Sequence, residues 1–248
     1  MRYLLLLTIL LVSFSCVSSR YIHIPPLISN LEEKGDYAVS GSIATSSGVR
    51  TLNANAYYAI SDHFVAHIGF TESKDYVKDR FNAQGNVTNM ALGYTNNNKN
   101  KTFYIENFLG YGFGNIRNTE LQNADSFADF SFSNIYNQFN LNLKRNDGGV
   151  KRENYFSFHL PIRVEYVQLN SLAFTNYDIA EERNIRDNPN LLIFTVSKAI
   201  HYNFKHFTLG LFVSYHSPTN GLELLTAENA YIGFTANWRS FLKGKKKR

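Results

Sequence analysis

The feature that most constrains the fold is a period-two alternation of apolar and polar residues that recurs along most of the chain. One clear run occupies 51–60, and another occupies 231–239, where Ile232, Phe234 and Trp238 alternate with mostly polar residues. Successive side chains of a β-strand point to opposite faces, so each run predicts a strand with one apolar and one polar face. No helical pattern of any length accompanies these runs.

The alternation, punctuated by Gly, Asn, Asp and Ser, predicts ten strands. We expect them at 36–46, 49–60, 63–71, 82–95, 101–115, 128–144, 152–169, 190–202, 206–216 and 229–240. Short connections mostly alternate with long ones, and an antiparallel meander then gathers the long connections at one end, as outer-membrane barrels do. The predicted fold class is all-β, an antiparallel up-and-down transmembrane β-barrel of about 10 strands, with 8 strands as the alternative.

A soluble β-sandwich would show the same alternation, because exchanging inside and outside leaves the pattern unchanged. Composition favours the barrel: aromatic residues make up 15% of the chain and charged residues only 18%, below the roughly 25% that is usual in soluble domains. Apolar faces rich in Phe suit lipid, and opposite faces rich in Asn, Ser, Thr and Tyr suit a narrow lumen. A surface-anchored soluble β-sandwich remains the alternative fold.

The N-terminus has the pattern of a secretory signal. Arg2 precedes an apolar run, 4–12, that is too short to cross a bilayer core of ~30 Å, and small residues follow it. Cys16 is the only cysteine, which excludes a disulfide framework. Its position resembles the lipobox of bacterial lipoproteins, and this resemblance implies acylation of Cys16. Ordinary cleavage after Ser15 or Ser19 is the alternative.

These patterns divide the chain into four expected parts. They are a signal peptide at 1–15, a lipidated N-terminal tether at 16–35, a β-barrel domain at 36–240 and a basic C-terminal tail at 241–248. Pro25-Pro26 would keep the tether free of regular structure.

The net charge of +5 lies mainly in the basic tail, so the body of the chain is close to neutral. A nucleic-acid-binding domain would instead spread Lys and Arg over a folded face, and we therefore exclude nucleic acid as a partner. An even strand count returns the chain to the side where it began. We expect both termini on the periplasmic side of the outer membrane, with acylated Cys16 in the inner leaflet.

Several short motifs cluster near the start of the expected barrel: Pro25-Pro26-Leu27, the step Lys34-Gly35-Asp36, Gly41, and the run 56–63, which ends in Asp-His. In these motifs the chain resembles a family of outer-membrane β-barrel lipoproteins from Bacteroidota-type bacteria. In that family a proline-containing tether and a Lys-Gly-Asp step lead into a first hairpin closed by an Asp-His turn. The resemblance is mainly over 16–70 and implies a barrel at the outer membrane. It brings no established catalytic residues.

Four ionisable residues are expected to face the lumen. His159, Arg163 and Glu165 share one face of the strand 152–169, opposite its apolar face, and Glu106 lies on the corresponding face of 101–115. The interior of a small barrel is just wide enough to be filled by side chains, so charges there are normally paired. We predict a structural polar cluster, with a narrow conduction path as the functional alternative.

The remaining motifs do not predict a reaction. The chain has seven His, but His63 and His67 lie about 13 Å apart along one strand face, too far to share an ion. His216 and Ser217 are adjacent and so point to opposite faces, which excludes a dyad. The glycines of 110–114 lie within a strand and make room in the lumen rather than bind phosphate. We predict no catalytic, cofactor-binding or metal-binding residue.

The sequence therefore predicts a small outer-membrane barrel that is not an enzyme and has a structural or interaction role through its external loops. Outer-membrane lipid is one expected partner, and the long loop Asn170–Pro189 is the expected surface for an external ligand or protein. A narrow porin-like channel for ions or small solutes is the alternative function. An outer-membrane lipid hydrolase is a further alternative.

Overall fold

A computed structural model of the chain describes part of the sequence. It covers residue 22 and residues 24–46, 49–75, 81–97, 102–120, 125–144, 154–176, 179–204, 206–218 and 230–240. The expected signal peptide, the expected lipidation site Cys16 and the basic tail lie outside the described residues. Within the described part, no helix is long and apolar enough to cross a membrane.

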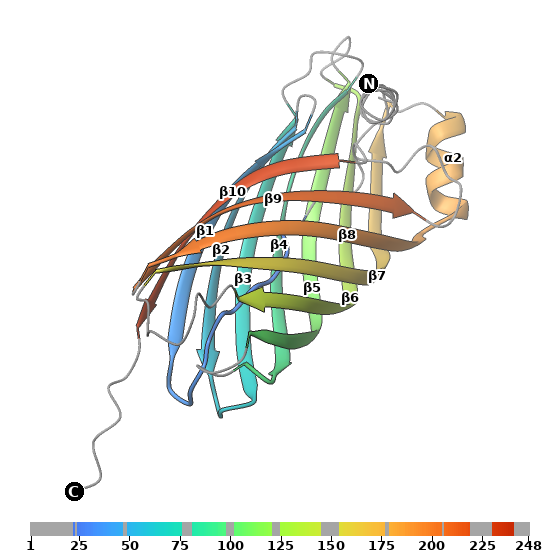
Figure 1. Cartoon of the computed structure of the whole chain (residues 1–248). Coiled ribbons are helices and arrows are strands. Elements are labelled where there is room, and N and C mark those ends of the chain that lie inside the picture. The colour runs from blue at the N-terminus through green and yellow to red at the C-terminus, as the bar shows by residue number, and fades with distance from the viewer. Residues whose placement is uncertain are drawn as a thin grey trace, which may run out of the picture.

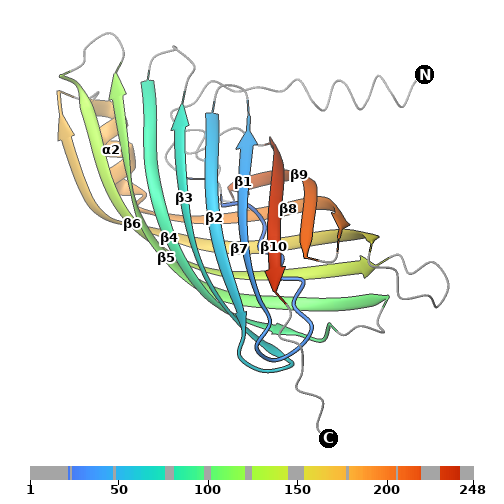
Figure 2. The same ribbon diagram turned by 90° about the vertical axis from the view of Figure 1, so that its left-hand side faces the viewer.

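The described chain forms one closed antiparallel barrel in which each strand pairs with its neighbours in sequence and β1 pairs with β10 (Figures 1 and 2). The strands are β1 (Tyr37–Thr45), β2 (Val49–Ala59), β3 (Phe64–Asp75), β4 (Phe81–Thr95), β5 (Phe103–Glu120), β6 (Phe127–Lys144), β7 (Tyr155–Thr175), β8 (Asn190–Asn203), β9 (Phe207–Pro218) and β10 (Ala230–Ser240). The ten-stranded up-and-down prediction is confirmed. The closed sheet excludes both the eight-stranded alternative and the β-sandwich.

The two ends of the barrel are defined by their connections. The turn end holds the connections that follow β2, β4, β6 and β8, together with the paired residues Tyr37 and Ser240. The loop end holds the other connections and a nine-residue helix, α2 (Ile179–Asp187). β5 continues to Glu120 and β7 to Thr175. The expected long loop Asn170–Pro189 is therefore largely strand and helix.

Burial alternates along the strands in the sense that the sequence predicted. In β2 the polar side chains Asn53 and Asn55 face inward and are 6% and 7% exposed, whereas outward Leu52 and Tyr58 are 37% and 51% exposed. The polar face of the sheet thus lines the lumen, and the apolar face surrounds the barrel. This arrangement is the inverse of a soluble protein, in which the apolar face lies inside.

Glycines at alternate positions of β5 make room for large inward side chains. Gly110 lies opposite Tyr136 of β6, and a Cβ at Gly110 would overlap the Tyr136 ring. A Cβ at Gly112 would overlap the side chains of Asn134 and Asn89 in the same way. The expectation that these glycines widen the lumen is confirmed.

We expect Gly110→Val to destabilise the barrel by about 1–3 kcal/mol, because the buried Tyr136 ring must move to admit the new side chain. Leu109→Val, on the adjacent outward and 60% exposed position, is the matched control and should change stability much less. The urea midpoint of unfolding in lipid, followed by gel mobility without boiling, measures both. Equal midpoints for the two variants would contradict this packing.

Candidate functional site

The lumen is occupied by the N-terminal segment of the same chain, which we call the plug (residue 22 and residues 24–35). It contains neither helix nor strand, as the Pro25-Pro26 step led us to expect. Its apolar side chains are buried, Leu27 and Leu31 being 0% and 1% exposed. The plug runs from the loop end to the turn end, where it continues into β1 (Figures 1 and 2).

This placement differs from the expected tether at 16–35, because residue 22 and residues 24–31 lie inside the barrel. The physical reason is apolar burial: each large aliphatic side chain moved out of water stabilises the structure by ~1.5–3 kcal/mol. Five such side chains in the plug are buried, namely Ile22, Ile24, Leu27, Ile28 and Leu31. A free tether would leave them in water.

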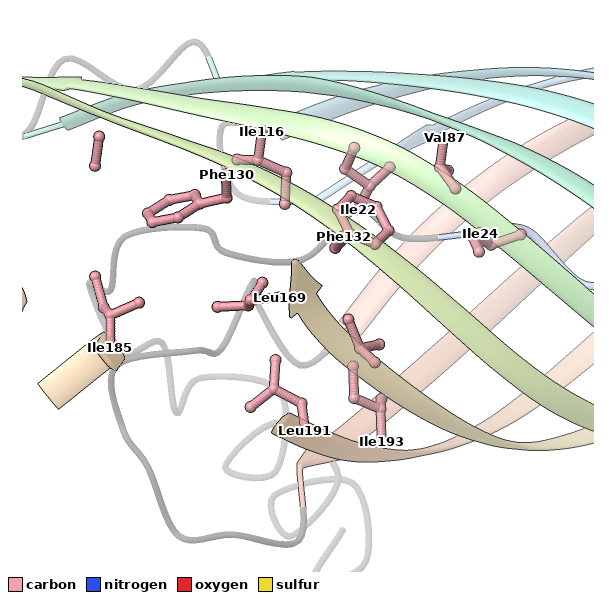
Figure 3. Close-up of a cluster of buried hydrophobic side chains, with 12 residues drawn as sticks. Ile22, Ile24, Val87, Ile116, Phe130, Phe132, Leu169, Ile185, Leu191 and Ile193 are labelled. Carbon is pink, nitrogen blue, oxygen red and sulfur yellow. The ribbon is translucent and has the colours of Figure 1, made fainter. Parts of the chain in front are cut away.

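At the loop end the plug packs into an apolar cluster. Figure 3 shows Ile22 and Ile24 among side chains from the facing walls, including Ile116 of β5 and Leu191 of β8. Ile185 of α2 belongs to the same cluster and is 1% exposed. The helix therefore folds back onto the barrel mouth and does not project from it.

In the middle of the lumen, wall side chains bond to the plug backbone. Arg163 donates to the carbonyl oxygens of Ile24 and Pro25 at 3.3 and 3.4 Å. Proline lacks an N–H, so this stretch offers mainly acceptors, and the guanidinium is a side chain with donors only. Two further residues, Gln138 and Asn140, donate to the Leu27 carbonyl oxygen at 2.8 and 2.7 Å.

Glu106, fully buried on β5, accepts hydrogen bonds from both the plug and the wall in the next layer. Its carboxylate accepts a short hydrogen bond from the Ser29 hydroxyl of the plug. It also accepts from the amides of Asn140 and Asn142, at 3.1 and 3.3 Å. A buried carboxylate without such donors would carry a large desolvation cost. The hydrogen bond from Ser29 offsets part of this cost and holds the plug against β5.

At the turn end the plug is held by charged and polar groups of three strands. Lys144 forms an ion pair with Glu32 at 2.7 Å, and both side chains are largely buried. Asn30 adopts a left-handed backbone with φ of 53°, which Asn tolerates better than most residues. Its side-chain oxygen accepts from the Tyr104 hydroxyl at 2.6 Å, and its carbonyl oxygen accepts from Arg239 at 3.4 Å.

The Lys34-Gly35-Asp36 step turns the chain from the plug into β1. Gly35 has φ of 89° and donates its N–H to the Ala59 carbonyl oxygen at 2.8 Å. The N–H of Lys34 donates to the Asp62 carboxylate at 2.9 Å, so the step and the Asp-His turn contact one another. Burial raises the pKa of Asp36, an effect partly opposed by backbone N–H donors from the preceding turn.

The four residues of the predicted polar cluster, Glu106, His159, Arg163 and Glu165, all face the lumen, between 0% and 3% exposed. Amide side chains connect them: Asn142 bonds to both Glu106 and His159, the latter at 2.7 Å. Arg163 donates to Gln138, which donates to the Asn140 that holds Glu106. Glu165 accepts from the Asn134 amide, in a separate part of the lumen. Amide side chains thus link Glu106, His159 and Arg163 to one another.

One set of contacts has the order of a nucleophile, a base and an orienting group. The Ser157 hydroxyl lies 2.9 Å from Nε2 of His159, whose Nδ1 lies 2.7 Å from the Asn142 side-chain oxygen. Activation of a serine needs this geometry, but it also needs room for a substrate. Ser157 is 0% exposed, and the cavity between the plug and the wall beside His201 has a volume of ≈ 20 Å³, enough for about one water. With the plug in place, this set satisfies buried polar groups.

Two further histidines face the lumen from different strands. His216 faces inward and lies 2.8 Å from the Thr195 hydroxyl, whereas Ser217 is exposed outside, as the predicted opposite faces require. His67 is buried against Asn55 at 2.9 Å. Across the described residues, no group of three His, Cys, Asp or Glu side chains is placed to hold a metal ion.

The described ends of the chain lie at opposite ends of the barrel. Ile22 packs with Ile185 at the loop end, whereas Ser240 pairs with Tyr37 at the turn end. The expectation that both termini lie on one side followed from the even strand count, which ignores a segment that passes through the lumen before β1. Both termini themselves lie outside the described residues.

Comparisons with known proteins found similar folds only among solved structures; no family model and no curated protein matches the sequence. The translocator domain of the autotransporter NalP from Neisseria meningitidis is 9% identical, covering 85% of this chain and 90% of that chain, with a TM-score of 0.47. The β-domain of the Bordetella autotransporter Brka is 9% identical over 84% and 99%, with a TM-score of 0.48. Ail, the attachment invasion locus protein of Yersinia pestis, is 10% identical over 84% and 99%, with a TM-score of 0.34. At these identities the likeness concerns the fold alone.

We expect Glu106→Leu to destabilise the barrel by about 3 kcal/mol or more, because it removes the acceptor for the Ser29 hydroxyl and two buried amides. Glu106→Gln keeps one acceptor oxygen and should cost less. Glu72→Leu, at an exposed position of the outer wall, is the control. The urea midpoint of unfolding is measured for each variant, and it should be lowest for Glu106→Leu, higher for Glu106→Gln and highest for Glu72→Leu. A Glu106→Leu barrel as stable as the wild type would show that this layer does not hold the plug.

Proposed function

We propose that this chain is a bacterial outer-membrane β-barrel whose lumen is sealed by its own N-terminal segment and whose loop end serves as an interaction surface. The observation that carries the proposal is the plug, which fills the lumen from one end to the other with apolar and hydrogen-bonded contacts. A sealed lumen leaves the outer surface and the loop end as the parts available to other molecules.

Support for a membrane location comes from a ring of outward aromatic residues at the turn end. Tyr37 and Trp238, on the strands that close the barrel, contact each other edge to face at 5.5 Å. Aromatic girdles of this kind mark the interface between lipid and water. The exposed members of the ring are Tyr37, Tyr58, Phe64, Tyr94, Phe103, Phe156, Phe204, Phe207 and Trp238.

A second set of outward aromatics toward the loop end bounds an apolar band. Ten positions separate Phe103 from Phe113 in β5, and ten separate Phe156 from Tyr166 in β7. At ~3.3 Å per residue and a tilt of ~40°, ten positions rise about 25 Å, the height of the apolar band of outer-membrane barrels. The band therefore matches the membrane that we propose.

Few polar side chains interrupt this band. Asn107 and Asn137 face outward, and each donates to the other, at 3.1 and 3.3 Å. Lys198, at an exposed outward position of β8, has a long apolar stem that can carry its charge toward the interface. Both arrangements lower the cost of polar groups in lipid.

The interaction surface that we propose is the wall of β5–β7 beyond the band, together with α2. Its outward side chains are polar. Arg117 and Asp129 form a bidentate ion pair with two hydrogen bonds of 2.6 Å. The hydroxyls of Ser131 and Ser171 lie 2.6 Å apart. In α2, Ile179 is 75% exposed while Ile185 is buried. A polar wall with one exposed apolar anchor suits a protein or external ligand, and it modifies the expected site at 170–189.

A narrow channel for ions or small solutes is the second candidate. The inward wall favours it, because the uncharged polar side chains Ser40, Ser42 and Asn55 line a small cavity between the wall and the plug. Conduction requires displacement of the plug. The two candidates thus differ in whether the plug stays in place.

Planar-bilayer recording separates them. We expect the wild-type protein to show no steady unitary current, and the variant Arg163→Met/Gln138→Met to show one, because it removes side-chain contacts with the plug backbone. Arg117→Met/Gln84→Met makes the same two changes on the exposed outer wall and should remain silent. A lower gel mobility after boiling checks that each protein is folded.

Steady currents from the wild-type protein would favour the channel over the sealed barrel. Silence of a folded Arg163→Met/Gln138→Met variant would show that these contacts do not close the lumen. A protein that dissolves without detergent would overturn the membrane location itself.

A further inference from the structure

We infer that the plug threads the barrel from the outer to the periplasmic side: Ile22 lies at the loop end, at the outer face of the membrane, while the C-terminal end of β10 lies at the periplasmic face. The outward direction rests on the proposed function, which places the loop end outside. The threading itself rests on the described contacts alone.

The path of the plug is fixed at the loop end by apolar packing. Ile22 lies against wall residues near the loop ends of their strands, and Ile185 of α2 completes the same cluster (Figure 3). A Cβ at Gly85, near the loop end of β4, would touch the Ile22 side chain, which places Ile22 close to that wall. The chain before Ile22 thus starts from the loop end.

The C-terminal end of the plug is held at the turn end. Glu32 is paired with Lys144, the last residue of β6, and the Asp36 amide closes a turn onto Glu33 immediately before β1. Between the two ends, Arg163 and Gln138 hold the backbone at Pro25 and Leu27. These contacts at three levels leave the segment a single direction through the lumen.

The length of the segment is sufficient for a full passage. Fourteen steps join Ile22 to Asp36, and at ~3.3 Å each they reach up to about 46 Å. The apolar core of a bilayer is ~30 Å thick. The plug therefore spans the membrane inside the barrel even though it is not fully extended.

Threading changes where an N-terminal anchor would act. Six steps separate Cys16 from Ile22, a reach of at most about 20 Å. An acyl chain on Cys16 would therefore enter the outer leaflet from the external side, and not the inner leaflet that an even strand count suggests. The direction of threading requires no acylation of Cys16, because it rests on the contacts of Ile22 and the plug.

Three single-tag variants of the full chain test the inference. One short epitope is inserted between Arg20 and Tyr21, one after Gly221 in the connection between β9 and β10, and one after Arg248. Antibody binding is measured on intact cells and again after the outer membrane is permeabilised. We expect the first two epitopes to be bound on intact cells and the third only after permeabilisation.

The epitope after Gly221 separates threading from orientation. Threading requires the N-terminal epitope to share the side of the Gly221 epitope, and an N-terminal epitope that shares the side of the C-terminal one would overturn it. If the N-terminal and Gly221 epitopes are both hidden while the C-terminal one is bound, threading holds and the proposed orientation fails. Mobility shifts on boiling confirm that the variants compared are folded.

Discussion

The rest of the structure depends on closure of the sheet. An open sheet leaves unpaired backbone N–H and C=O groups along its two edges, and a closed sheet has no such edges. Here the closing pair is β1 with β10, in register from Tyr37–Ser240 to Thr45–Ile232. Eight strands enclose an interior that side chains can just fill, so ten strands enclose more, and the plug occupies the additional space.

The plug and the wall match each other chemically as well as in volume. The stretch that begins with Pro25-Pro26 offers carbonyl oxygens, and the wall meets it with Arg163 and two amides. Glu106 needs donors because it is fully buried, and Ser29 of the plug supplies one of them. Mutual satisfaction of this kind makes removal of the plug costly, since it would leave a buried carboxylate and several amides short of partners.

The sequence predicted the repeated elements well because each strand carries its own signal. Ten strands, the inward polar face, and the lumen positions of Glu106 and His159 follow from alternation within single segments. The plug has no such period. Its partners are distant in sequence: Leu27 bonds to Gln138 and Arg239 bonds to Asn30, separations of 111 and 209 residues. The spacing of its apolar side chains, read together with the glycines of β5, was the available signal. Helix α2 was missed because tertiary packing of Ile185 stabilises a short helix in a stretch without an apolar periodicity.

Hydrogen–deuterium exchange of the full chain in lipid tests the central claim, that the N-terminal segment seals the lumen, most directly. The account predicts that peptides from 24–31 exchange as slowly as peptides from the middle of β5, because the segment is buried and the Leu27 N–H donates to Gln138 of the wall. Complete exchange of 24–31 within seconds, with β5 still protected, would show a free tether beside an open barrel and would contradict the account.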